Sequence, residues 1–222
     1  MFESYFLYWG AVWDVLPKMA NGLLITLEIG VMSIALGLGV GVAGALARNS
    51  SRRAVATAAL VYVEIMRNSP SLVKMYFIYF GLPSLGIYPG PLLSAVAALV
   101  LHNGAYMTEI VRGGLAAIPR TQVLAARSLG MGTWTTFQVV ILPQAFDNVL
   151  PSLSNNWVEI VKDTSLTGAL SVREFFHVVE EQISATLRSF EFLTVAAVVY
   201  LVLTASLSGA LRTAEARIKY RR

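Results

Sequence analysis

Residues 118–146, IPRTQVLAARSLGMGTWTTFQVVILPQAF, decide the fold of this chain. They form the one long interruption of an otherwise apolar sequence that carries a helical signal of its own. Good helix formers fill residues 120–129, and Gly130 and Gly132 then end the run. The stretch therefore predicts a short, separate helix between two apolar segments.

Composition places those apolar segments in a membrane. Of the 222 residues, 56% are apolar and only 14% are charged, whereas an average soluble domain has about 25% charged residues. That balance is typical of a membrane protein rather than of a soluble core. Cysteine is absent, so the chain has no disulfide, thiolate metal site or cysteine nucleophile.

We predict an all-helical integral membrane protein with five spans. The first span, residues 23–47, is apolar except for Glu28 and exceeds the roughly 20 residues that cross ~30 Å of hydrocarbon. Residues 1–20 lack the basic start of a signal peptide, and their aromatic residues at helical spacing predict a helix at the membrane surface. The other spans are residues 54–82, 92–111, 135–162 and 190–211, and residues 172–187 form an amphipathic helix before the last span.

The second span is broken by a polar cluster. Glu64, Arg67 and Pro70 interrupt it, and a proline frees a backbone carbonyl and bends a membrane helix. Glu64 and Arg67 are three residues apart and can pair in the low dielectric of the membrane. We assign these residues structural roles, together with Pro143 in the fourth span.

The basic residues give the orientation. Residues 48–53, 112–134 and 212–222 hold three, three and five Lys and Arg, whereas the N-terminal segment, residues 83–91 and residues 164–189 hold one, none and two. The first group therefore faces the cytoplasm, and the N-terminus faces outward. The net charge of +4 follows from this topology, so we predict no nucleic-acid partner.

The fourth span carries a polar stripe. Its members recur every three or four residues and therefore share one face of a helix. Lipid does not accept such a face, because each charge at the bilayer centre costs about 2.5–3.5 kcal/mol even on the lenient insertion scale. The stripe faces protein or water, either as the lining of a translocation pathway, which its length favours, or as hydrogen bonds that hold a bundle or dimer together. It consists of Gln144, Asn148, Ser152, Asn155, Glu159 and Lys162, with Asp147, Asn156 and Asp163 beside it.

Polar residues also repeat in the third span. Asn103, Tyr106 and Glu109 follow one another at steps of three. Asn103 and Tyr106 lie deeper in the span, and we assign them to the same pathway as the stripe. Glu109 lies close to the cytoplasmic end, next to Arg112, where pairing with an arginine is favoured over substrate binding.

The predicted helix over residues 120–129 presents a small apolar patch, with Arg120 and Arg127 elsewhere on the turn. A short helix between two membrane spans with such a patch fits a groove on a partner protein. An ordinary helix at the membrane surface is the alternative, and the spacing does not separate the two. The patch consists of Leu124, Ala125, Ser128 and Leu129.

Several enzyme motifs are misplaced or absent. Gly39, Gly41 and Gly44 form a G-x-G-x-x-G pattern, but it lies inside an apolar span and not between a strand and a helix. Gly37 and Gly41, four residues apart, favour a close-packing helix face over dinucleotide binding. The sequence has no G-x-x-x-x-G-K-[ST] run and so no ATP site of that kind. His102 and His177 lack metal-ligand spacing and no serine has a paired base, so we predict neither a metal site nor catalytic residues.

A resemblance extends these predictions. Residues 124–126, Gly130, Val140, Leu142 and Pro143 fall in the register of E-A-A, three residues, glycine, nine residues, I-x-L-P. The stretch resembles the EAA loop of permease subunits in binding-protein-dependent ABC importers. The runs YVEIMRNSPSLVKMYFIYFGLP and VKDTSLTGALSVREF are similar to the branch for polar amino acids and opines. One departure is Leu124, which stands where the family has a glutamate and removes a polar contact to the ATPase.

The resemblance implies a type I ABC importer permease of the bacterial inner membrane. Its partners would be an ATP-binding subunit, a second permease, an extracytoplasmic solute-binding protein, a polar amino acid as substrate and membrane lipid. The chain itself would need no cofactor, because the partner subunit binds ATP. Residues 1–20 would be extracytoplasmic, residues 21–211 the permease domain with a coupling loop at 112–134, and residues 212–222 a basic cytoplasmic tail. The implied coupling residues are Arg120, Leu124, Ala125, Ala126, Arg127, Ser128 and Gly130.

A second function stays open on the sequence. The chain can also be read as an ATPase-independent transporter or channel with the fourth span as its pore, and more distantly as a membrane enzyme. A slight acidic excess near the stripe, from Asp147, Glu159 and Asp163 against Lys162, suggests a cationic or zwitterionic substrate. The sequence does not identify the amino acid. Leu124 favours a second permease that differs from this one.

Overall fold

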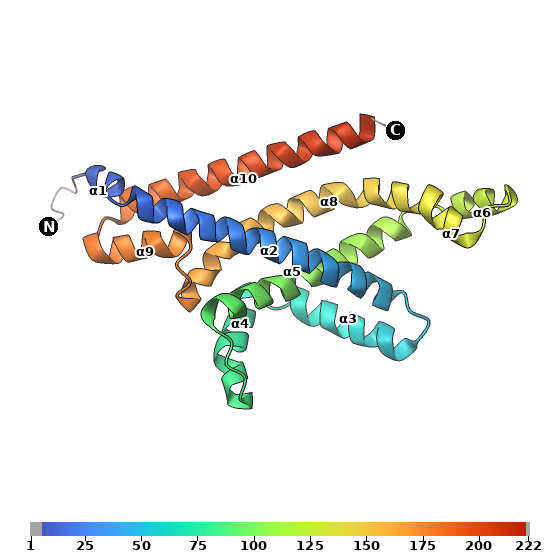
Figure 1. Ribbon diagram of the computed structural model, residues 1–222, viewed down its shortest axis with the longest axis horizontal. Coiled ribbons are helices and arrows are strands. Elements are labelled where there is room, and N and C mark those ends of the chain that lie inside the picture. The colour runs from blue at the N-terminus through green and yellow to red at the C-terminus, as the bar shows by residue number, and fades with distance from the viewer. Residues whose placement is uncertain (1–5, 221–222) are drawn as a thin grey trace. The chain divides into compact units, whose positions relative to one another are not determined.

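The structure is a computed structural model that describes residues 6–220, and all regular structure in that part of the chain is helical (Figure 1). The all-helical prediction is confirmed. In chain order the elements are α1 (Gly10–Trp13), α2 (Leu16–Arg48), α3 (Arg53–Arg67), α4 (Ser71–Tyr76), the π-helical turn η1 (Phe77–Gly81), the 3-10 turn η2 (Leu82–Leu85), α5 (Pro91–Ala116), α6 (Arg120–Ser128), α7 (Thr133–Thr136), the π-helical turn η3 (Phe137–Ile141), α8 (Leu142–Asp163), the 3-10 helix η4 (Thr164–Leu170), α9 (Phe175–Thr186) and α10 (Ser189–Tyr220).

The described chain forms two compact units, and the long helices α2, α5, α8 and α10 each contribute to both. Unit 1 comprises the described residues up to Ser33 together with Ser71–Leu99 and Ile160–Leu207, and unit 2 comprises Ile34–Pro70, Val100–Glu159 and the chain from Ser208 onward.

The predicted spans correspond to helices of different regularity. By length and composition, two helices could each cross a membrane: α2 over Leu16–Arg48 and α10 over Ser189–Ile218. The third predicted span lies within α5. The second is assembled from α3, α4, η1 and η2, and the fourth from α7, η3 and α8. The second span, with its polar break, and the fourth span, with its polar stripe, are therefore the two that are built from pieces.

The predicted surface helix over residues 1–20 is wrong in its extent. Only the single turn α1 precedes α2, which begins at Leu16, and residues 1–5 lie outside the described part of the chain. Pro17 explains the early start, because proline fits the first turn of a new helix but not the interior of one that continues from α1. Trp9 and Trp13 are exposed, as a surface location requires.

The predicted break in the second span is confirmed, since α3 ends at Arg67 and α4 begins at Ser71. The predicted pair of Glu64 with Arg67 is wrong. The Glu64 carboxylate accepts a hydrogen bond from the Asn68 amide at 2.9 Å. Arg67 instead lies over the ring of Tyr106 in α5, with 5.1 Å between the guanidinium carbon and the ring centroid, and this cation–π contact directs it away from the acid.

In unit 2, α2 and α5 approach closely along the glycines of the first span. A Cβ atom on Gly41 would lie 2.1 Å from the Cβ of Met107, and one on Gly44 would lie 2.1 Å from the Thr108 hydroxyl. That hydroxyl donates to the backbone carbonyls of Gly104 at 2.8 Å or Gly41 at 3.3 Å. The glycines therefore form a helix-packing face, as the sequence indicated, because any larger residue would separate the helices.

The predicted amphipathic helix over residues 172–187 is confirmed as α9. Its apolar side, which includes Phe175, Val178 and Val179, packs in unit 1 against Met19 of α2 and Phe192 of α10. This cluster is the apolar core of unit 1 around α9.

Glu174 ties the same three helices together by polar contacts, and its side chain is fully buried. The carboxylate accepts hydrogen bonds from the backbone N–H groups of Phe176 at 2.9 Å and His177 at 2.7 Å, and so caps α9. It also accepts from the hydroxyls of Thr26 in α2, at 3.1 Å, and Tyr200 in α10, at 3.3 Å. Burial raises the pKa of the Glu174 carboxyl above its usual range, against the opposing effect of these hydrogen bonds.

Candidate functional site

The loop between the third and fourth spans forms the short helix predicted for it. α6 begins after Pro119, which has extended backbone angles, and ends in a left-handed residue, Gly130, with φ of +79°. The N–H of Gly130 donates to the carbonyl of Arg127 at 2.9 Å, and that of Met131 donates to Ala126 at 3.1 Å. These two bonds are a Schellman ending, which is why glycine stands at this position.

The apolar patch predicted on α6 is exposed. Leu124 and Leu129 are 62% and 82% exposed, and Ala125 and Ser128 are exposed beside them. Ala126 differs from the other implied coupling residues, since it is only 4% exposed and faces inward within unit 2, and so positions the helix rather than offering a contact.

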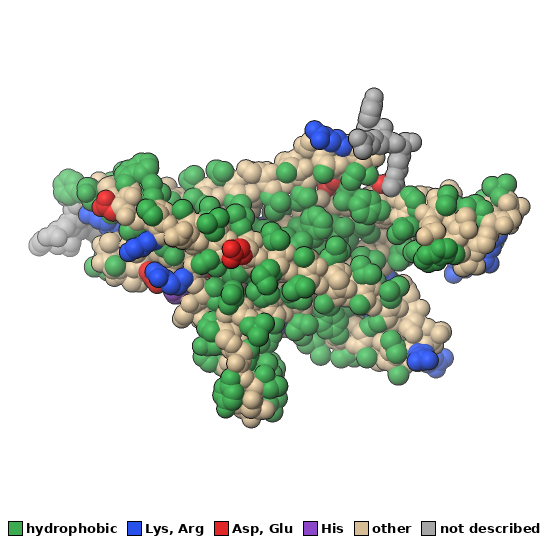
Figure 2. Space-filling view, viewed as in Figure 1, with side chains coloured by type: hydrophobic (Ala, Val, Ile, Leu, Met, Phe, Trp, Pro, Cys, Tyr) green, Lys and Arg blue, Asp and Glu red, His purple; other side chains and the backbone are tan. Residues whose placement is uncertain are grey.

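Basic and aromatic side chains extend the surface around α6. Arg120 and Arg127 are exposed on other sides of the helix. Trp134, at the start of α7, is 68% exposed and stacks on Phe137, with 5.9 Å between ring centroids. Figure 2 shows green and blue side chains gathered over α6 and α7. The combination of apolar, aromatic and cationic groups is suited to a protein partner.

The polar stripe of the fourth span lies on one continuous helix, α8, and most of it is exposed on the surface of this chain. Its first member, Gln144, is half-buried and its side chain donates to the backbone carbonyl of Val140 at 2.8 Å. The other five members are exposed, so this face of α8 is accessible on the surface of the described chain. The exposed members are Asn148, Ser152, Asn155, Glu159 and Lys162.

Asp163 differs in its surroundings from the stripe. It is half-buried in unit 1, where its carboxylate accepts a hydrogen bond from the Ser71 hydroxyl at 2.9 Å. The buried Lys74 of α4 lies near enough for an electrostatic interaction with the same carboxylate. A polar cluster thus lies at the end of α8 and consists of Asp163, Ser71 and Lys74. The sequence analysis had named only Asp163.

Two of the residues predicted on the third span occupy different environments. Asn103 is fully buried in unit 2 and packs on α2 at Gly37. A Cβ atom added to Gly37 would lie 2.8 Å from the Cβ atom of Asn103. It therefore does not line a surface here, because the missing side chain of Gly37 lets α2 cover it. Tyr106 is half-buried between Arg67 and the tilted ring of His102, whose centroid lies 4.8 Å away.

Glu109 has the structural role expected of it. Its carboxylate accepts from Arg112 at 2.6 Å and lies 3.5 Å from the side chain of Arg48 at the end of α2. Two guanidinium groups of one unit therefore share a single carboxylate. Among the described residues, no group of three or more His, Cys, Asp or Glu side chains is arranged to hold a metal ion.

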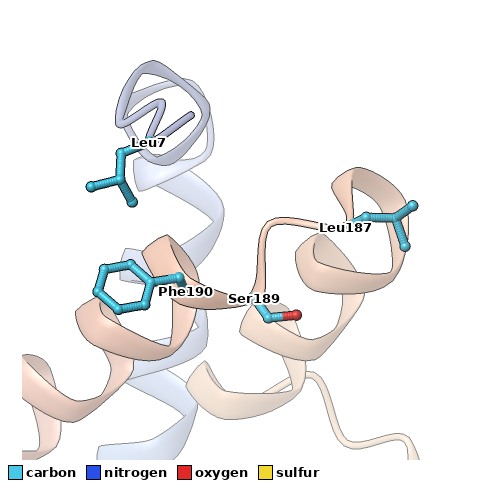
Figure 3. A pocket seen from close by; sticks show the side chains of 4 residues that line it. All are labelled: Leu7, Leu187, Ser189 and Phe190. Carbon is cyan, nitrogen blue, oxygen red and sulfur yellow. The ribbon is translucent and has the colours of Figure 1, made fainter. Parts of the chain in front are cut away.

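A cavity of about 530 Å³ lies in unit 1, and none of its lining residues belongs to the polar stripe (Figure 3). Leu7 and Phe190 lie on one side of it, and Leu187 lies across from them with its side chain directed away. The lining is almost wholly apolar, with Ser189 as its one hydroxyl. Such a surface fits lipid better than a polar solute, so we do not place the substrate there.

These features together define a class of protein, an integral membrane transport subunit whose loop helix and polar stripe are both left open for other molecules. The chain belongs to the family of binding-protein-dependent transport system inner membrane components, which matches residues 14–220.

Individual relatives agree along almost the whole chain. The glutamine transport system permease protein GlnP of Escherichia coli (strain K12) is 36% identical over 213 residues, which cover 95% of this chain and 97% of that protein. The nopaline transport system permease protein NocM of Agrobacterium fabrum is 34% identical over 209 residues, covering 90% and 87%.

The fold has a solved counterpart in the crystal structure of an amino acid ABC transporter with histidines. That chain is 30% identical and superposes with a TM-score of 0.91, covering 96% of this chain and 100% of its own. The type I ABC importer permease fold predicted from the sequence is therefore confirmed. The chain is a transport subunit and not an enzyme, and the ATPase is a separate subunit.

Sequence reasoning missed two features of the site. Lys74 was given no place in the predicted site, although the structure buries it near Asp163. The π-helical turns η1 and η3 were also missed. A signal for them existed, because residues 77–83 and 137–143 share the pattern F-x-x-x-x-L-P.

Proposed function

We propose that this chain moves a polar amino acid or an opine inward, receiving it from an extracytoplasmic binding protein and coupling to an ATP-binding subunit through α6. The observation that supports this most directly is the exposure of both the α8 stripe and the α6 patch in one chain. A membrane helix with an open polar face is stable only against water or another subunit. The relatives named above are permeases for glutamine and nopaline.

The pathway in this proposal is lined by α8 and completed by a second permease. Asn148, Ser152, Asn155 and Glu159 would face that partner across the substrate, with Lys162 at the end of the stripe. Tyr106 and Asp163 would lie to its sides, whereas Asn103 would support the packing behind it. Whether the second permease is a copy of this chain is a separate question, and Leu124 favours a different one.

A zwitterionic or cationic substrate is our proposal for the cargo. Glu159 is exposed on the stripe and offers a carboxylate to an ammonium or guanidinium group. Replacing it with glutamine should weaken the competition of arginine against glutamine uptake. Unchanged relative competition by the two amino acids in that variant would remove Glu159 from substrate selection.

Coupling through α6 is tested with a single introduced thiol. The chain has no cysteine, so Ser128→Cys supplies its only thiol. The position is exposed, and the serine hydroxyl donates to the Leu124 carbonyl of the same helix at 3.1 Å. We expect a bifunctional thiol reagent in native membranes to crosslink it to the ATP-binding subunit, as mass spectrometry of the adduct would show. Ser184→Cys, an exposed position on α9, is the control and should give no such adduct.

The contrary result is equally clear. If Ser128→Cys reacts with monofunctional reagents but captures no ATP-binding subunit at any linker length or nucleotide state, α6 is not the coupling element. The chain would then use another surface for its ATPase, or would transport without one.

A further inference from the structure

A small polar cavity lies in unit 2 between α8 and the end of α10. Its volume is about 190 Å³, which is small beside the ~300–1,000 Å³ of pockets for drug-sized ligands. A space of this size admits one small polar solute and no peptide. The lining residues are Pro151, Ser154 and Asn155 of α8 and Ser208, Arg212 and Glu215 of α10.

The cavity offers charges of both signs. The Glu215 carboxylate accepts a hydrogen bond from the buried hydroxyl of Ser154, which fixes one of its oxygens at the wall. Arg212 lies one helical turn earlier on α10, and its side chain is exposed. Among the described side chains these two do not form an ion pair, although residues three apart on a helix are placed to do so. Arg212 and Glu215 therefore line the cavity as two separate charged groups.

The remaining lining groups complete a pattern of donors and acceptors. Ser208 supplies a hydroxyl and Asn155 an amide, each of which both donates and accepts hydrogen bonds. A guanidinium binds a carboxylate with two parallel hydrogen bonds, and a carboxylate accepts from an ammonium group. A free α-amino acid carries both groups on one carbon, so it matches a cavity that places a cation and an anion one helical turn apart.

We propose that this cavity binds the zwitterionic head of an α-amino acid, with the ligand carboxylate at Arg212 and its ammonium group at Glu215. The inference rests on the proposed function, because it takes the transported molecule to be an amino acid or an opine. Residues 212–222 form the most basic segment of the chain, which places this end of α10 on the cytoplasmic side. In this proposal the ligand enters the cavity from the cytoplasmic side, as the transported product.

The cavity also predicts a consequence for transport. Asn155 belongs to the polar stripe and lines the cavity as well, so a bound amino acid would connect the stripe helix to α10. A ligand that bridges two helices favours the arrangement in which both contacts are made. Amino acid accumulated in the cytoplasm would hold the permease in that arrangement and slow the next cycle.

The test uses the complete importer, reconstituted in lipid nanodiscs without its binding protein. Equilibrium binding of radiolabelled L-glutamine and L-arginine is measured for the native protein, Arg212→Gln, Glu215→Gln and Arg217→Gln. Arg217 is exposed on the same helix and does not line the cavity, so its variant is the matched control. We expect the two cavity variants to bind about tenfold more weakly than the control, since each removes one charge-assisted contact. All variants are first shown to be monodisperse and assembled with the ATPase.

A second measurement links binding to regulation. In proteoliposomes, uptake is compared with and without the same amino acid preloaded on the ATPase side, and we expect preloading to slow the native protein but not Arg212→Gln. Equal binding by native and cavity variants, absence of binding by the native protein, or equal inhibition in all variants would each overturn the proposal. Failure of the proposed function is seen separately, as absence of amino acid uptake by the native importer.

Discussion

Gly130 shows how one residue shapes the surface offered to a partner. A Cβ atom built on Gly130 would have no atom within 4 Å, so there is room for a side chain. Glycine is therefore favoured here by the backbone conformation and not by lack of space. Its φ of +79° costs an ordinary L-residue about 1–2 kcal/mol, while asparagine tolerates this region. The exposed Leu129 directly before it depends on that turn for its direction.

We therefore predict opposite results for two substitutions at this position. Gly130→Val should leave the protein folded in the membrane but lower transport about tenfold, because the end of α6 must leave the left-handed conformation. Gly130→Asn should transport nearly as well as the native protein. Uptake and membrane content are measured together.

A neighbouring glycine provides the control for this prediction. Gly132 has φ of −65° and open space around it, so Gly132→Ala should be neutral. Equal transport by Gly130→Val and Gly130→Asn would show that the left-handed turn does not matter for coupling.

Glu174 gives a residue-scale prediction with a pH dependence. Its folded-state pKa is raised, so the unfolded chain releases this proton first as pH rises. The stabilisation from the neutral carboxyl is fully present below the unfolded pKa of about 4.3 and is lost as pH rises through the folded pKa. Compared at about pH 5 and about pH 8, the native chain should therefore be less stable relative to Glu174→Gln at the higher pH, because the glutamine cannot ionise.

The same experiment includes a truncation. Glu174→Ala removes the cap of α9 and leaves the hydroxyls of Thr26 and Tyr200 without this partner, which should cost about 2–4 kcal/mol at either pH. Thermal unfolding of the purified protein in detergent measures all three forms. If the difference in stability between the native protein and Glu174→Gln stayed constant across this pH range, the carboxyl would have the same charge in the folded and unfolded states.

At the scale of elements, the two π-helical turns share one cause. Each occupies the first five residues of an F-x-x-x-x-L-P run, and the residue four before each proline, Tyr79 or Val139, is the centre of its turn. A proline has no N–H for that carbonyl and its ring crowds it, so the helix widens there. Proline alone is not sufficient, because Pro151 lies inside α8 without such a turn.

The turn η3 lies where movement of the loop helix could be passed to the stripe helix. It joins α7, which packs under α6, to α8, which carries the polar stripe. The side chain of Gln144 donates to the Val140 carbonyl within this turn at 2.8 Å. A π-helical turn between the loop helix and the stripe helix is suited to change its winding when the loop moves.

We predict that Pro143→Ala restores regular α-helical bonding through residues 139–143 and uncouples transport. The local helix should gain up to about 3 kcal/mol, seen as slower amide hydrogen exchange over these residues. The amount of substrate moved per ATP hydrolysed should fall several-fold in the reconstituted importer. Val139→Ala trims an exposed side chain without changing the backbone and is the control. If Pro143→Ala moved as much substrate per ATP hydrolysed as the native protein, η3 would have no role in coupling and would only accommodate the proline.

At the scale of the whole molecule, the features that depend on local periodicity could be predicted from the sequence, and those that depend on opposing elements could not. Apolar runs, the break before Pro70 and the loop helix α6 were all readable from residues close in sequence. The burial of Asn103 was not, because it depends on Gly37 in another helix. The nearness of Lys74 to Asp163 likewise joins two spans.

The end of the chain shows the same limit in another form. Residues 212–222 were expected as a basic tail, yet α10 continues to Tyr220. Their alanine, arginine and glutamate residues are good helix formers, so an apolar helix that enters them has no reason to stop. Charge marks where a helix leaves the membrane and does not mark where the helix ends.

The orientation of the molecule rests on its basic residues and can be tested with single cysteines in the cysteine-free chain. Thr121 on α6 and Ser184 on α9 are both exposed, and one predicted span, residues 135–162, lies between them. A membrane-impermeant maleimide should therefore label Ser184→Cys in intact spheroplasts and label Thr121→Cys only after the membrane is opened. A permeant maleimide should label both and controls for reactivity. Labelling of both from one side would mean that the chain does not cross the membrane between them, which would contradict the fourth span. The reverse pattern would keep the spans and invert the orientation, and would place α6 beyond the reach of a cytoplasmic ATPase.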